Sequence, residues 1–201
     1  LIKYFLIILF FTLLLGGIFL FKKANQKNPP EPKKETAIEK NNPEIEVKNP
    51  IINIPLEDAL SRITKKPFGI QVSPGNSPVQ PERFSGYHTG ADFEIKTDEE
   101  NKEIPVKTIC SGELIFKGDI NGYGGVAVQK CKIQEQPVTV IYGHLDLKSI
   151  DDEGVFLTKE ENLGILGEGF SSETDGERKH LHLGIHKGTE INFLGYVENP
   201  K

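Results

Sequence analysis

Two histidines alternate with leucines near the C-terminal end of this 201-residue chain, in Lys179-His180-Leu181-His182-Leu183-Gly184-Ile185-His186. Apolar residues at every second position predict a half-buried strand, from which His180 and His182 would project on one face, about 6–7 Å apart. Imidazole is the commonest metal ligand and the usual acid or base near neutral pH. The stretch is therefore a candidate for metal binding or proton transfer. The alternative is a pair of surface histidines on an edge strand.

All five histidines lie between positions 88 and 186, and two further segments carry the same chemistry. His88 and Asp92 flank Thr89-Gly90-Ala91, where Gly90 and the β-branched Thr89 disfavour a helix. We expect the two side chains to converge through a bend into a strand that begins near Asp92. His144 ends the apolar run 140–143. Taken alone each fragment is weak, because such spacings occur often by chance.

Short β-type runs separated by turn residues fill the chain from Phe68 onward. They predict strands at 106–110, 113–117, 125–130, 138–142 and 163–166, with 118–124 as the turn of a hairpin. Residues 56–64 predict one short helix with Leu60 and Ile63 on its apolar side. No period of about 30 residues recurs. The predicted fold class is mainly β, an antiparallel sheet or sandwich.

The N-terminal third has a different composition. Residues 1–21 are almost wholly apolar, and about 20 such residues span a bilayer, whereas a secretory h-region has about 7–15. No small-x-small cleavage site follows, so we expect one uncleaved transmembrane helix, with a cleaved signal peptide as the alternative. Lys3 on one side and Lys22 and Lys23 on the other leave its orientation open. Residues 22–55 are rich in Pro, Lys, Glu and Asn and predict a disordered, flexible stalk.

The net charge bears on the class of binding partner, and the two cysteines bear on whether a disulfide forms. The net charge of −5 and the pI of about 5.6 do not suggest a nucleic-acid partner. Cys110 and Cys131 fall in the predicted hairpin, where ladder extension brings them near bridging distance, and an extracytoplasmic location would permit oxidation. The alternative is two unrelated small apolar side chains. Neither cysteine is assigned to catalysis.

Taken in order, four fragments resemble the lysostaphin-type (LytM-type) zinc endopeptidases: 87–92, Gly122-Tyr123-Gly124, 142–145 and His180-Leu181-His182. The resemblance extends over about residues 68–196. It implies a peptidase domain at 56–201 with a compact β-rich fold of the duplicated-hybrid-motif class. It also implies one Zn²⁺ ion and hydrolysis of peptide bonds in peptidoglycan.

Carried over position by position, the resemblance implies that His88, Asp92 and His182 are the zinc ligands and that His144 and His180 are catalytic. Two nitrogens and one carboxylate oxygen leave a fourth tetrahedral position open, as in catalytic zinc sites. One of the two catalytic histidines would take the proton of the attacking water, and the other would stabilise the developing oxyanion. Which histidine does which stays open.

The chain departs from the family pattern at a few positions. Lys179 stands where the family usually has proline and His186 where it often has arginine, whereas Gly184 stands where it commonly has Glu or Gly. His186 is in phase with His180 and His182, but we expect it in the groove wall or in solvent, not as a ligand. Residues 168–177 are expected to form a loop that borders the groove. These departures bear on substrate preference more than on catalysis.

Three functions from different classes follow. The first is a membrane-anchored zinc endopeptidase, held in the cell membrane by its N-terminal helix, with its catalytic domain on the extracytoplasmic side and peptidoglycan peptides as substrate. The second is a non-catalytic LytM-like scaffold that binds or activates other cell wall hydrolases. Retention of all five matching positions argues against it. The third is a structural β domain with incidental histidines. The bond cleaved, the wall type and the oligomeric state stay open.

Overall fold

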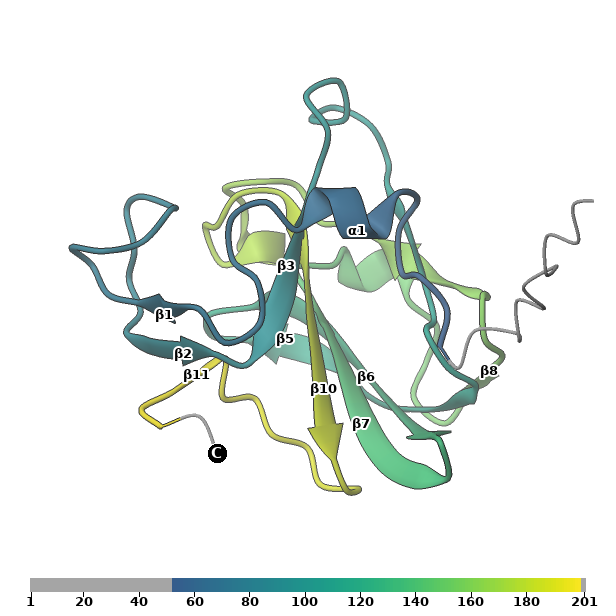
Figure 1. Cartoon of the computed structure of the whole chain (residues 1–201). Coiled ribbons are helices and arrows are strands. Elements are labelled where there is room, and N and C mark those ends of the chain that lie inside the picture. Colours follow the sequence, from purple (N-terminus) through teal and green to yellow (C-terminus); the bar gives the residue numbers. More distant parts are fainter. Residues whose placement is uncertain (1–51, 200–201) are drawn as a thin grey trace, which may run out of the picture. The chain divides into compact units, whose positions relative to one another are not determined.

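The computed structural model describes residues 52–199, which form an almost entirely β structure (Figure 1). The predicted transmembrane segment 1–21 and residues 22–51 of the predicted linker lie outside the described residues. Within 52–199, no helix is long and apolar enough to cross a membrane. The strands are β1 (Gln71–Val72), β2 (Gly86–His88), β3 (Gly90–Glu94), β4 (Pro105–Lys107), β5 (Gly112–Ile120), β6 (Gly124–Ile133), β7 (Gln136–Gly143), β8 (Phe156–Leu157), β9 (Asn162–Ile165), β10 (His180–Lys187) and β11 (Tyr196–Val197). The helical elements are α1 (Ala59–Arg62) and the 3₁₀ turns η1 (Leu147–Ser149) and η2 (Ser172–Thr174).

A six-stranded antiparallel sheet in the order β3-β10-β7-β6-β5-β8 forms the framework of the described part. Two smaller antiparallel sheets accompany it, β1-β2-β11 and β4-β9. The prediction of a mainly β, antiparallel domain is therefore confirmed. The predicted strand at 106–110 is shorter than expected, and as β4 it pairs with β9 outside the main sheet.

Strand β10 lies between β3 and β7 and is paired on both sides. Its alternating pattern places Leu181 in the core, fully buried, and His180 and His182 on the opposite face, also buried. The alternative of an edge strand with surface histidines is therefore wrong. A strand paired on both sides has its register fixed twice, which gives its side chains a defined position.

The main core packs against the face of the sheet that carries Leu181. Tyr142 of β7 is fully buried there; its hydroxyl donates to Oε1 of Gln129 at 3.2 Å and accepts the Ile109 N–H at 3.0 Å. Core packing is thus the role of Tyr142.

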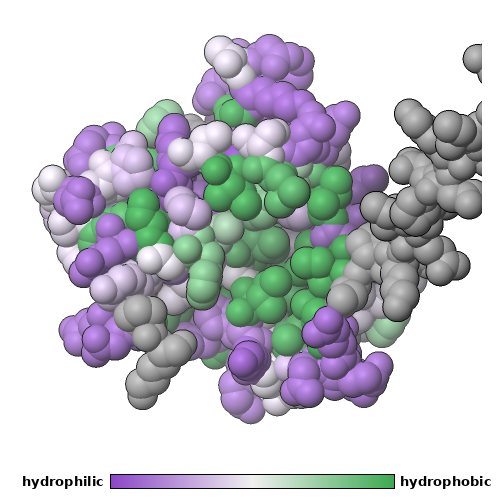
Figure 2. All heavy atoms as spheres, in the orientation of Figure 1, coloured by the Kyte–Doolittle hydropathy of each residue, from purple (hydrophilic) through white to green (hydrophobic). Residues whose placement is uncertain are grey.

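Figure 2 shows apolar side chains gathered over α1, β10 and β7. Leu60 of α1 and Ile185 of β10 are exposed. A second, smaller apolar cluster lies on the other face and consists of Tyr123, Val126, Val128 and Ile141.

The helix is shorter than predicted. It spans one turn, because Asp58 before it adopts a left-handed conformation (φ 55°) and Ile63 leaves the helical region. Leu60 is 85% exposed, so the prediction that it lies on a buried apolar side is wrong. Just before this helix, the Asn53 N–H donates to the Ile109 carbonyl and the Pro55 carbonyl accepts from the Lys107 N–H. Residues 53–55, assigned by sequence to the linker, thus pair with the folded domain.

The hairpin β5–β6 brings the two cysteines together, and Cys110 and Cys131 form a disulfide. The turn is tighter than predicted, because β5 continues to Ile120 and β6 begins at Gly124. A bulge between Leu114 and Phe116 shifts the register. The disulfide left open by the sequence is therefore present, and it joins Cys131, which pairs with Gly112 at the end of the β5–β6 ladder, to Cys110 just before β5.

Candidate metal centre

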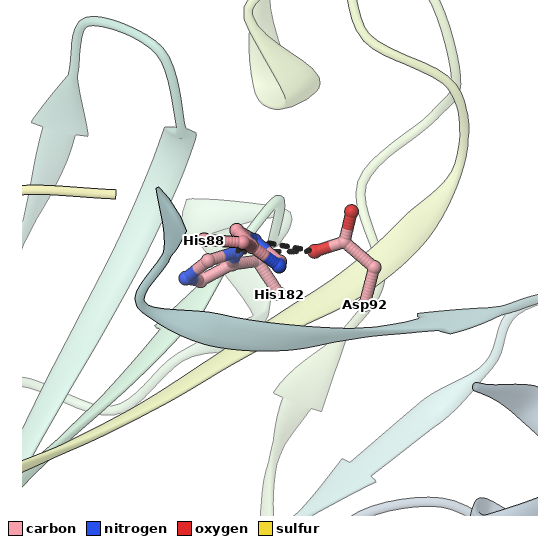
Figure 3. A group of neighbouring side chains, drawn as sticks. All are labelled: His88, Asp92 and His182. Carbon is pink, nitrogen blue, oxygen red and sulfur yellow. Dashed lines mark hydrogen bonds and ion pairs between the residues drawn. The ribbon is translucent and has the colours of Figure 1, made fainter. Parts of the chain in front are cut away.

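Three side chains from three strands meet in one buried cluster: His88 at the end of β2, Asp92 in β3 and His182 in β10 (Figure 3). Nε2 of His88 lies 3.0 Å from Nδ1 of His182. Oδ1 of Asp92 lies 3.1 Å from Nδ1 of His182 and 3.3 Å from Nε2 of His88. The three side chains that the sequence predicted as ligands therefore direct two nitrogens and one oxygen toward a common point.

The size of this triangle fits a divalent ion. Ligands at about 2.0–2.1 Å from a tetrahedral zinc ion are about 3.3 Å apart. The three separations of 3.0, 3.1 and 3.3 Å lie close to that value. Three ligands from the protein leave one tetrahedral position for water or substrate. The cluster can hold zinc with little rearrangement.

Neighbouring backbone groups fix the ligands. Nδ1 of His88 faces the Pro67 carbonyl at 3.4 Å, so its proton sits there and Nε2 is left for the metal. The Asp92 N–H donates to the Lys66 carbonyl at 2.9 Å. Asp92 and His182 lie directly opposite each other in the β3–β10 ladder. The expected bend between His88 and Asp92 is present, although both residues lie within strands, β2 and β3.

Gly90, which lies between His88 and Asp92 in the chain, leaves room for the ring of His182. A Cβ atom at this position would lie 2.5 Å from Nε2 of His182 and 2.7 Å from the Leu183 carbonyl oxygen. A side chain at position 90 would therefore displace either the ligand or the strand that carries it.

The two remaining histidines lie beside the cluster. Nε2 of His180 is 3.3 Å from Oδ2 of Asp92, and its Nδ1 donates to the Arg178 carbonyl at 2.7 Å. His144 follows β7 in a left-handed conformation (φ 65°), held by bonds from its N–H to the Tyr123 carbonyl and from the Gly167 N–H to its own carbonyl. The structure therefore brings all five predicted site residues together.

These groups line a cavity of about 310 Å³. Its wall includes Tyr123, whose buried hydroxyl has no hydrogen-bond partner among the described residues. The ring of Tyr123 meets that of His182 edge to face, with centroids 5.0 Å apart. The sequence singled out the Gly122-Tyr123-Gly124 motif without giving Tyr123 a role. Its unpaired hydroxyl beside the metal cluster makes it a candidate donor to substrate.

Burial and charge set the protonation states of the site. Burial lowers the pKa of His182 despite the opposing effect of Asp92, so this ligand is neutral, as metal binding requires. Burial also lowers the pKa of His144 well below its usual value, and the neighbouring His180 adds to this. For Asp92, burial opposes ionisation, but the surrounding His180, His182 and His88 outweigh it and keep the pKa well below the usual range.

The sequence also predicted positions for His186 and for the loop 168–177 at the border of the groove. His186 is half-buried, is absent from the ligand cluster and lies on the same face as His182, since a Cβ on Gly184 would approach both rings. The loop 168–177 contains η2, and its last residue, Glu177, lines the cavity. The loop thus borders the groove as expected.

A sequence profile of peptidase family M23 matches residues 86–193, more than half of the chain. The matched range contains all five histidines and Asp92. The chain therefore belongs to peptidase family M23, and the resemblance to the LytM-type peptidases is confirmed.

Several solved structures are similar in fold. A zinc-containing peptidase from Vibrio cholerae is 20% identical over 67% of this chain and 36% of its own, with a TM-score of 0.45. Csd3 from Helicobacter pylori is 21% identical over 74% of this chain and 35% of its own (TM-score 0.42), and LytU is 22% identical over 65% and 76% (TM-score 0.47). This chain thus spans about a third of the length of the first two. Similarity at this level carries no information on activity. No curated protein matches the chain significantly.

Proposed function

We propose that this protein is a zinc endopeptidase that hydrolyses peptide bonds of peptidoglycan, with His88, Asp92 and His182 as the zinc ligands. The observation that carries the proposal is the triangle of ligand atoms, with sides of 3.0–3.3 Å, beside two further histidines in a cavity. When bound, zinc supplies Lewis acidity and lowers the pKa of its water toward about 7.

Side chains of this protein would supply the proton acceptor and the hydrogen-bond donors. His180 donates its Nδ1 proton to the Arg178 carbonyl, which leaves Nε2 free to accept the proton of the attacking water. Once protonated, Nε2 lies 3.3 Å from Oδ2 of Asp92, which stabilises the imidazolium. His144 and Tyr123 are placed to donate hydrogen bonds to the charge that develops on the scissile carbonyl oxygen.

A digestion assay tests the proposal. The purified full chain, loaded with zinc, should clear a suspension of isolated peptidoglycan, and mass spectrometry of digested defined muropeptides should identify the bond cleaved. His180→Ala should retain stoichiometric zinc and lose the activity. A wild-type protein that holds zinc and leaves every muropeptide intact would instead support a non-catalytic binding or activating role. A well-folded protein that binds no zinc would contradict the proposed peptidase activity.

We also propose that the domain works outside the cytoplasmic membrane, anchored by residues 1–21. Peptidoglycan lies there, and the Cys110–Cys131 disulfide is consistent with an oxidising compartment. Protease added to intact spheroplasts should cleave within 22–51. Protection of this segment, with cleavage only after lysis, would contradict the location.

A further inference from the structure

Arg178 joins the metal cluster to a second carboxylate. Its Nη2 donates to Oδ2 of Asp92 at 2.9 Å and to Oε1 of Glu94 at 2.5 Å, and its Nε donates to both oxygens of Glu94 at 3.0 Å. Asp92 and Glu94 are two residues apart in β3 and so lie on the same face of the sheet. The guanidinium thus bridges two acidic groups that would otherwise repel each other at close range.

The two oxygens of Asp92 have separate partners. Oδ1 faces the nitrogens of His88 and His182, where the metal would bind. Oδ2 faces Nη2 of Arg178 and Nε2 of His180. One carboxylate oxygen is therefore directed at the metal position and the other away from it.

The backbone of the same residue acts on the neighbouring histidine. The Arg178 carbonyl accepts the Nδ1 proton of His180 at 2.7 Å. Arg178 thus contacts the ligand carboxylate through its side chain and the proposed base through its main chain. It is well placed to hold both, because its side chain is only 12% exposed.

We propose that Arg178, oriented by Glu94, is a positioning residue that restricts Asp92 to one-oxygen ligation and so keeps the fourth metal position open. This inference rests on the proposed zinc site. A carboxylate can bind a metal ion through one oxygen or two, and a second bond from Asp92 would add a fifth ligand and crowd the position that water needs. A guanidinium donates along fixed directions and can hold Oδ2 in place, whereas a lysine ammonium is a point charge without this geometry.

The competing explanation is that Arg178 only fastens the loop 168–177 to the domain. Arg83 offers a matched control, since its Nη2 pairs with Asp175 at 3.1 Å and with Glu177 at 3.0 Å on that loop. Within residues 52–199, Arg83 makes no hydrogen bond or ion pair with the three ligands, and its side chain is 46% exposed. If loop attachment were the role of Arg178, loss of Arg83 should have a similar effect on the metal.

The test uses the full chain in detergent with Co²⁺ in place of zinc, because the visible absorption of Co²⁺ falls when its coordination number rises above four. Arg178→Met should lower the absorption per bound Co²⁺ at least twofold and weaken Zn²⁺ binding, measured against a chelator, by about 10–100-fold. Arg178→Lys, which keeps the charge and guards against simple misfolding, should lower the absorption as well. Glu94→Gln should give a smaller change in the same direction. Arg83→Met should leave both quantities at the wild-type value.

The outcomes separate the two proposals. If the wild-type chain binds neither Co²⁺ nor Zn²⁺, the proposed function fails. If the wild type binds metal and Arg178→Met and Arg178→Lys keep its spectrum and affinity, the positioning role is overturned. A change in Arg83→Met as large as in Arg178→Met would assign the effect to the loop. A wild-type spectrum in Arg178→Lys alone would show that charge suffices and would overturn the role of the guanidinium geometry.

Discussion

The ring of His144 packs on that of His180, with centroids 4.2 Å apart and planes inclined by 40°. Two imidazoles at this distance cannot both be charged without strong repulsion in a buried site. Burial, followed by the proximity of His180, keeps the pKa of His144 well below its usual value. We therefore expect His144 to stay neutral, which favours His180 as the proton acceptor of the proposed reaction.

The proposed roles predict that both histidines contribute to kcat and that neither is needed for zinc binding. His180→Ala should lower kcat by about 10²–10⁴-fold, because it removes the proton acceptor. His144→Ala should lower kcat by a similar or smaller factor through loss of a donor to the oxyanion. Both variants should bind zinc stoichiometrically, measured by atomic absorption alongside initial rates on a muropeptide. Loss of zinc from either variant would mean that the histidine ligates or supports the metal.

Gly90 provides a steric test of the metal cluster. Because a Cβ there would lie 2.5 Å from Nε2 of His182, Gly90→Ala should weaken zinc binding at least tenfold and lower activity with it. Gly75→Ala is the matched control, since nothing lies within 4 Å of a Cβ at that position. Chelator competition on both variants checks the prediction. Equal affinities would show that the ring of His182 can move without cost.

Glu99 should give a pH-dependent contribution to stability. Its carboxylate accepts two hydrogen bonds from Arg62, at 2.6 and 2.8 Å, and chiefly these lower its pKa from 4.5 to about 2. A pKa lowered in the folded state stabilises the fold above the unfolded value and loses that effect as pH falls. Glu99→Gln should therefore cost about 1–3 kcal/mol at pH 7, with the gap to wild type closing between about pH 4.5 and 2.

Urea unfolding in EDTA, which removes metal release as a variable, measures this gap at several pH values. Asp98→Asn serves as the control, because Asp98 pairs with Lys102 at the exposed surface and should contribute nothing measurable. A pH-independent difference between wild type and Glu99→Gln would contradict the ion-pair explanation.

The disulfide should stabilise the domain without affecting the metal. Cys110 and Cys131 are 21 residues apart, and closing a loop of this length stabilises by about 3 kcal/mol. The double variant Cys110→Ser/Cys131→Ser should lose about this much in urea unfolding and keep wild-type zinc affinity, since neither residue lines the cavity. Reduction of the wild type should reproduce the loss. Unchanged stability would mean that the bridge adds no net constraint.

The meeting of His88, Asp92 and His182 in one cluster could be predicted from the sequence because local patterns carry most of it. Alternation around His180 and His182 fixes their common face, and Thr89-Gly90 fixes the bend after His88. The order of the four fragments along the chain then indicated that Asp92 lies close to these histidines. No single fragment indicates this. The same alternation puts His186 in phase with His180 and His182 and so could not exclude it, whereas the cluster itself consists of His88, Asp92 and His182.

Features that depend on register and long-range packing could not be predicted. The contacts of Arg178 with Asp92 and Glu94 require the exact alignment of β3 with β10, in which His180 lies opposite Glu94. Nothing in the local sequence distinguishes such a buried arginine from a solvated one. The one-turn length of α1 likewise depends on the left-handed Asp58, a conformation that few non-glycine residues adopt.

The pairing of β10 with strands on both sides means that an error in its register would affect the metal cluster and the core at once. Sliding this strand by one residue against β3 and β7 would turn leucines toward the cavity and drive imidazoles into the apolar core. Misaligned chains would therefore lose the metal-binding triangle and the hydrophobic contacts together. Correct alignment of β10 and the capacity to hold a metal ion at this site therefore depend on the same register.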